Sequence, residues 1–258
     1  MSQVWKFTET EFFVLWKDAT NDILPGPFSF RSESESMTEF EDEIRSTRER
    51  LSHTMNRATR EIFEAIANPD LYVLVTGWNE KVALDPAAQI RVLASRKSIK
   101  GYSITQLPGD SFWQSSGYIV TECDPLRLAD EAVRALPDTQ VGQQRDFELT
   151  NHADYDYGYG GSSVQDTFTE SREGRSHRFL QEAASRAGRI RVIQGRSVFG
   201  PRGCAQHELR WRDLDGDGRY VITDEKPPAV RAVDAKRLTA LINTRIAAVI
   251  RSIKEERE

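Results

Sequence analysis

Residues 212–225 read RDLDGDGRYVITDE, a stretch that suits either a calcium loop or the tip of a β-hairpin. Alternating aspartates followed by glycine match the start of the EF-hand pattern D-x-[DN]-x-[DN]-G-x5-E. The final ligand position holds an aspartate, which reaches an ion less well than the usual bidentate glutamate. The flanking residues have the alternation and β-branching of strands, whereas an EF-hand needs two helices. The candidate calcium ligands are Asp213, Asp215, Asp217 and Asp224.

An internal match favours the hairpin. The segment GYSITQ at 101–106 resembles GRYVITD at 218–224, at a separation of 118 residues that aligns Tyr102 with Tyr220. The connection that leads into the first of these segments, SRKSIKG at 95–101, contains no acidic residue and therefore offers calcium no carboxylate. Asp-Gly pairs suit tight hairpin turns because these residues tolerate positive φ. We therefore predict a hairpin tip, with calcium binding as the alternative.

The same separation recurs elsewhere and indicates two similar halves. It aligns Gly77 with Gly195, and after a deletion of eight residues a separation of 110 aligns Asp124 with Asp234. Short connections between the last strands favour antiparallel pairing. We predict an α+β fold with pseudo-two-fold duplicated halves and a central, largely antiparallel sheet flanked by helical bundles. One domain would span 1–258, with an N-terminal half of about 1–137, a polar connection of about 138–176 and a C-terminal half of about 177–258.

Three local features carry predictions of their own. Thr8 and Glu11 form a capping-box pattern that predicts the start of a helix. A later helix is predicted to end at Gly188, because glycine favours the C-cap. At the separation of 118 residues Val92 aligns with Arg210, an apolar residue with a charged one. Since a shift of one residue turns a strand's side chains to the opposite face, the register of this hairpin stays open.

Composition excludes several classes of protein. The chain has 258 residues, 35 of them basic and 40 acidic, and its net charge of −5 argues against a nucleic-acid partner. No apolar run approaches the roughly 20 residues of a membrane span, and the N-terminus lacks the pattern of a signal peptide. We therefore expect a cytoplasmic location. Cys123 and Cys204 are too few for a zinc site or a disulfide scaffold, and we expect both to be free.

No motif in the chain points to catalysis. None of the four histidines has a metal-binding spacing, and there is no nucleophile elbow, Walker loop or dinucleotide fingerprint. His152, Asp154 and Asp156 lie in a tyrosine- and glycine-rich segment that we interpret as a surface loop. We therefore predict no enzymatic activity and no cofactor. An enzyme with a site around 150–178 is a further alternative, which a bound ligand or metal would support.

Four segments carry a family likeness: the N-terminal VWKFTETEFFVLW, the strand and turn GRIRVIQGRSVFGPRG, the strand GRYVI and the closing helix AVDAKRLTALINTRI. Together they resemble the EspG family of ESX (type VII) secretion-associated proteins. The resemblance spans nearly the whole chain, and it implies the pseudo-symmetric fold known for that family. The long connection with YDYGYGG is a departure from the family pattern, which bears on the choice of partner.

The resemblance implies a cytosolic chaperone that binds a PE/PPE-like export substrate and keeps its aggregation-prone tip soluble for delivery. A WXG-like secreted protein is an alternative partner. The family's contact surface, the central sheet with the C-terminal helical bundle, corresponds by position to strands at 206–212 and 219–225 and a helix at 234–254. The side chains predicted to contact the partner are Trp211, Tyr220, Ile222, Leu238, Leu241 and Ile242. The alternative for each of these residues is a place in the chain's own core. The alternative function is a calcium-binding regulatory protein that uses the acidic loop at 213–224.

Overall fold

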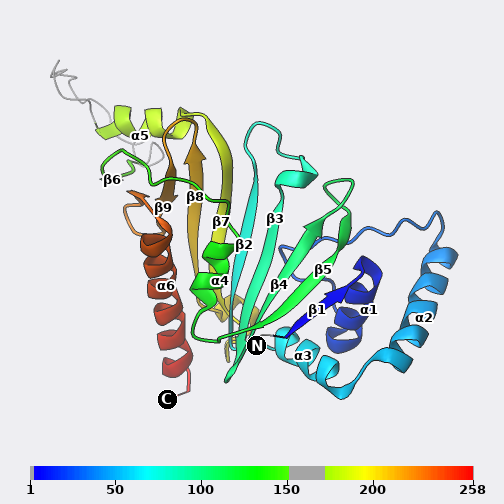
Figure 1. Cartoon of the computed structure of the whole chain (residues 1–258). Helices are drawn as coiled ribbons and strands as arrows, with labels where there is room; N and C mark the ends of the chain where they lie inside the picture. Colours follow the sequence, from blue (N-terminus) through cyan, green and yellow to red (C-terminus); the bar gives the residue numbers. More distant parts are fainter. Residues whose placement is uncertain (1–2, 151–171, 258) are drawn as a thin grey trace, which may run out of the picture.

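The computed structural model describes residues 3–150 and 172–257, and within them one large sheet carries helices on both faces (Figure 1). The strands are β1 Val4–Phe7, β2 Leu71–Asn79, β3 Ile90–Lys97, β4 Lys100–Pro108, β5 Ser115–Cys123, β6 Phe147–Glu148, β7 Ala184–Gln194, β8 Gln206–Leu214, β9 Arg219–Ile222 and β10 Ala229–Ala232. The helices are α1 Glu9–Thr20, α2 Met37–Thr54, α3 Arg57–Ala67, α4 Leu128–Arg134, α5 Arg172–Gln181 and α6 Ala235–Glu255. The predicted α+β class is confirmed.

The order of the strands reads alike in both directions from the centre of the sheet. Outward from the central β2–β7 pair run β3, β4, β5 and β1 on one side and β8, β9, β10 and β6 on the other. Every pairing of neighbouring strands in this order is antiparallel. The order agrees with a pseudo-two-fold arrangement. That the halves arose by duplication, and where they end, stays a prediction.

Strand pairing resolves the register that the sequence left open. Ile104 of β4 pairs with Leu93, while its counterpart Ile222 of β9 pairs with Arg210. The separation is therefore 118 residues between β4 and β9 but 117 between β3 and β8, so Val92 corresponds to Leu209. The extra residue lies in the second hairpin's turn, where Asp213 pairs with Arg219 across five residues, while the corresponding pair Arg96 and Gly101 is separated by four.

The same comparison extends to the neighbouring strands. Ile104 also pairs with Val120, and Ile222 with Val230, which reproduces the predicted separation of 110 residues. In the centre, Val92 pairs with Val75 and its counterpart Leu209 pairs with Ile190. The separation between β2 and β7 is therefore 115, and the alignment of Gly77 with Gly195 is wrong. A single constant separation fails because each connection between the strands has its own length.

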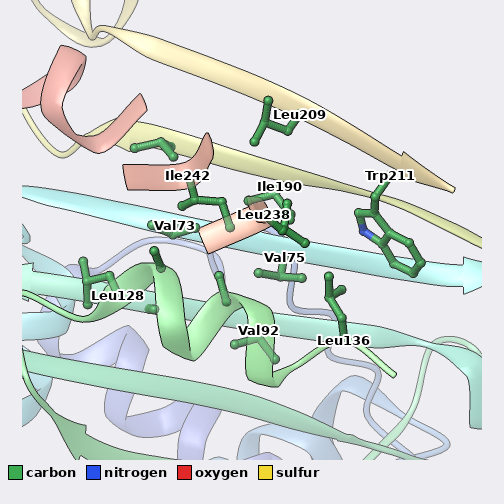
Figure 2. Packing of buried hydrophobic residues seen from close by; sticks show 14 of the residues in the cluster. Val73, Val75, Val92, Leu128, Leu136, Ile190, Leu209, Trp211, Leu238 and Ile242 are labelled. Carbon is green, nitrogen blue, oxygen red and sulfur yellow. The ribbon is translucent and has the colours of Figure 1, made fainter. Parts of the chain in front are cut away.

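One face of the sheet is covered by α4 and α6. Figure 2 shows this core, in which Val73, Val75, Ile190 and Leu209 of the sheet pack against Leu238 and Ile242 of α6 and Leu128 of α4. These side chains are at most 1% exposed. Successive residues of a strand point to opposite faces, so Leu74, which lies between Val73 and Val75, belongs to the other face.

The opposite face is covered at two places. Over β3, β4 and β5 the helices α1 and α3 contribute an aromatic core around Phe12, Phe63 and Tyr118, to which α2 adds Leu51. Over β9 and β10, Phe179 of α5 packs edge-on against Tyr220 in a smaller core. The segment 138–150 runs alongside and supplies β6. The predicted loop residues His152, Asp154 and Asp156 lie outside the described residues.

The structure tests the predicted start of one helix and the predicted end of another. The capping box of α1 is confirmed, since Thr8 and Glu11 each accept a hydrogen bond from the other's backbone N–H. The prediction that a helix ends at Gly188 is wrong, because α5 ends at Gln181 and Gly188 lies within β7. Glycine is needed there for packing, since a Cβ would meet the Thr76 carbonyl oxygen at 2.0 Å. Of the described helices, none has the length and apolar character to cross a membrane.

Candidate partner-binding surface

On the face of the sheet opposite α4 and α6, the middle carries charged side chains instead of a helix. Between the cores under α1–α3 and α5, strands β7 and β8 present Arg189, Arg191, Glu208 and Arg210. Their neighbours Ile190, Val192 and Leu209 point into the core under α6. The side chains of Arg189 and Arg191 are 56% and 42% exposed. We call this part of the sheet, with its exposed and partly exposed charged side chains, the open face.

A pocket of about 630 Å³ borders the open face. It is lined by residues of β2, by the segments 26–29 and 112–113, and by Arg189 and Arg191. Two large apolar side chains stand exposed at its lining, Leu84 at 64% and Trp113 at 54%. A second hollow of about 960 Å³ lies farther along, beside the β9–β10 connection, and Arg210 contributes to it.

Arg91 lines the first pocket and is only 8% exposed. Its guanidinium donates hydrogen bonds to the Ser29 hydroxyl and, at 2.7 Å, to the Phe112 carbonyl oxygen. It also lies 4.6 Å from the centre of the Phe112 ring. Burial lowers the pKa of Arg91, while the nearby Tyr118 and Glu9 act in the opposite direction. A largely buried cation thus forms part of the pocket wall.

Most of the side chains predicted to contact a partner belong to the chain's own core. Trp211, Leu238 and Ile242 are 0% exposed and lie between the sheet and α4 and α6 (Figure 2). Tyr220 and Ile222 are 1% and 4% exposed and pack under α5, while Leu241 is partly buried. That these six residues contact a partner stays a prediction.

Two of these residues also have polar groups with partners inside the chain. The indole N–H of Trp211 donates to the Thr76 carbonyl oxygen at 3.1 Å. The Tyr220 hydroxyl donates to the Asp217 carboxylate and accepts from the Gln144 N–H at 2.8 Å. Burial, together with the hydrogen bond to Asp217, raises the pKa of Tyr220 to about 12. Both side chains therefore fix neighbouring segments of the fold.

The stretch 212–225 forms the predicted hairpin. It contains the end of β8, a turn in which Gly216 has φ of 70°, and β9. Its carboxylates bind separate protein partners: Asp213 binds Arg219, Asp215 binds Lys81, Asp217 binds Tyr220, and Asp224 binds His207 and Arg245. No group of three or more potential metal ligands occurs among the described residues. The carboxylates thus act as structural partners of the surrounding strands and helices.

Asp224 connects the sheet to α6. One of its oxygens lies 2.7 Å from Nδ1 of His207 on β8, and the other accepts from Arg245, a residue of α6 that is only 7% exposed. Burial raises the pKa of Asp224, but the hydrogen bonds from His207 and Arg245 outweigh it, and the pKa lies below its usual value. The ionised carboxylate therefore stabilises the docking of α6.

The predictions made from the sequence did not include the arginines of the open face, although the strand GRIRVIQ shows two of them at alternate positions. Arg189 and Arg191 alternate with Ile190 and Val192, which is the pattern of a strand with one buried face. That pattern shows that the arginines share a face, but their neighbours across the sheet follow from the register alone.

Comparison with known proteins decides the family. The model of the EspG family matches residues 8–244. This chain belongs to the EspG family. Among solved structures, this EspG-family chain is similar in fold to the Mycobacterium tuberculosis type VII secretion system chaperone EspG5, which was solved in complex with the PE25–PPE41 dimer. The TM-score is 0.56 at 10% identity, over 95% of this chain and 96% of that chain, which shows a shared fold. A search of curated proteins found no match.

Proposed function

We propose that this EspG protein is a type VII secretion chaperone that binds a PE/PPE-like export substrate. The proposal is carried by the family match over residues 8–244. The fold shared along 95% of the chain with a chaperone solved with a PE–PPE dimer supports it. A shared fold by itself does not determine function, so the family match carries the proposal and the likeness in fold only adds to it.

The structure supports a protein as the ligand. The open face spans two hollows of about 630 Å³ and 960 Å³ on one side of the sheet. Exposed Leu84 and Trp113 next to arginines resemble the centre of a protein interface, where tryptophan and arginine are enriched. The bound partner would be shielded at its aggregation-prone tip and delivered from the cytoplasm. Trp211, Tyr220 and Ile222, with Leu238, Leu241 and Ile242, would then support this surface from beneath or contact the partner directly.

Co-expression tests the proposal. The chain, with an affinity tag, is produced together with a PE/PPE-like pair encoded beside it, and in parallel with a WXG-like protein from the same locus. We expect the PE/PPE-like pair to co-purify as a stoichiometric complex and to remain in the soluble fraction. The same pair produced without the chain should aggregate more. Failure of every neighbouring secreted protein to co-purify would refute the proposed function.

A further inference from the structure

Arg189 and Arg210 lie directly opposite each other on β7 and β8. Like charges at opposed positions of neighbouring strands destabilise the pair. The next opposed pair is Arg191 and Glu208, and the Glu208 carboxylate lies 3.9 Å from both Arg189 and Arg191. Within the described part of the chain, Arg210 forms no ion pair of its own. One carboxylate therefore serves a group of three arginines, although the chain as a whole is acidic.

The positive charge continues into the pocket of about 630 Å³. Arg189 and Arg191 line it, and so does the largely buried Arg91, whose hydrogen bonds go to the neutral Ser29 hydroxyl and Phe112 carbonyl. Beside these cations stand exposed apolar groups, Leu84 among them. A ligand that fits here combines an apolar group for the pocket with negative charge for the arginines.

We propose that this surface recognises an apolar anchor side chain of the export substrate that has an acidic residue next to it. The anchor enters the pocket between Leu84 and Trp113, and the carboxylate lies between Arg189 and Arg210. Guanidinium groups bind carboxylates in bidentate fashion, and the ion pair also relieves the repulsion between the two arginines. This inference rests on the proposed function, because it names the chemistry by which the same partner is recognised.

The test uses the PE/PPE-like pair that co-purifies with the chain. Its dissociation constant is measured for the wild type, for Arg189→Glu/Arg210→Glu and for Leu84→Ala/Trp113→Ala. Arg202→Glu is the matched control, because Arg202 is exposed on the turn at Pro201–Gly203 and lines neither of the two hollows. Thermal unfolding of each variant confirms that the fold is intact. Each affinity is measured at two salt concentrations.

We expect each double variant to bind at least about tenfold more weakly, and Arg202→Glu to bind like the wild type. Affinity of the wild type should fall with added salt, and that dependence should shrink in the arginine double variant. Equal affinity of the folded arginine variant and the wild type would refute the recognition of an acidic residue while leaving the proposed function intact. If the wild type binds no such pair, the proposed function itself fails.

Discussion

The variant Asp213→Ala tests whether the Asp213 carboxylate stabilises the fold or binds calcium. Asp213 and Arg219 form a pair whose side chains are 6% and 8% exposed, with hydrogen bonds of 2.7 Å and 2.8 Å. Arg219 also donates to the Pro137 carbonyl and lies 5.2 Å from the Trp211 ring. Removing the carboxylate leaves this buried guanidinium without its counter-ion. Loss of one partner from a buried ion pair costs about 3–5 kcal/mol of unfolding free energy.

The neighbouring Asp215→Ala is the matched control. Asp215 binds Lys81 at 2.6 Å, but these side chains are 37% and 62% exposed, so the loss should be about 0–1 kcal/mol. At roughly 2–4 °C per kcal/mol, Asp213→Ala should lower the melting temperature by about 6–20 °C, and the control by a few degrees at most.

The assay is thermal and urea unfolding in the presence of EDTA and then of millimolar calcium. We expect the large difference between the two variants in EDTA and no stabilisation of the wild type by calcium. Similar losses in the two variants would refute the buried-pair reasoning. Calcium stabilisation of the wild type that both variants abolish would instead support the calcium loop.

Three further predictions concern stability. Burial raises the pKa of Glu9 from 4.5 to about 7, so the folded chain binds the proton of the Glu9 carboxyl more tightly than the unfolded chain does. The free energy of unfolding should therefore fall as the pH rises from 4.5 to about 7, and urea unfolding of Glu9→Gln should show a smaller fall. The pKa of Asp224 is lowered, so its stabilising effect is lost as pH falls through the acidic range, and Asp224→Asn should reduce acid sensitivity; an unchanged acid profile would count against its role in holding α6. In Gly188→Ala the new Cβ would meet the Thr76 carbonyl at 2.0 Å and the Trp211 indole nitrogen at 2.6 Å, so a loss of at least about 1–3 kcal/mol is expected, and wild-type stability would refute this packing.

The sequence determined the local elements and the order in which they occur. The capping box at Thr8, the hairpin in RDLDGDGRYVITDE and the α+β class follow from side-chain periodicity and turn chemistry, which act between neighbours in the chain. The family resemblance could also be seen there, because it depends on residues spread along the whole chain.

Pairing between strands distant in the sequence determined which side chains are buried and which lie next to each other. In the sequence, Gly188 has the signature of a helix end, yet it lies in β7, where the Trp211 side chain and the Thr76 carbonyl occupy the space that a Cβ would need. For Trp211, Tyr220 and Ile222 the sequence left open an apolar surface patch and a place in the core, and their packing under helices shows that they are core. Arg189 meets Arg210 because β7 and β8 pair in one register, and a shift of a single residue would turn the strand over and separate them. Periodicity tells which residues share a face, but contact between strands is set by the tertiary structure, which alone brings the arginines and the pocket together.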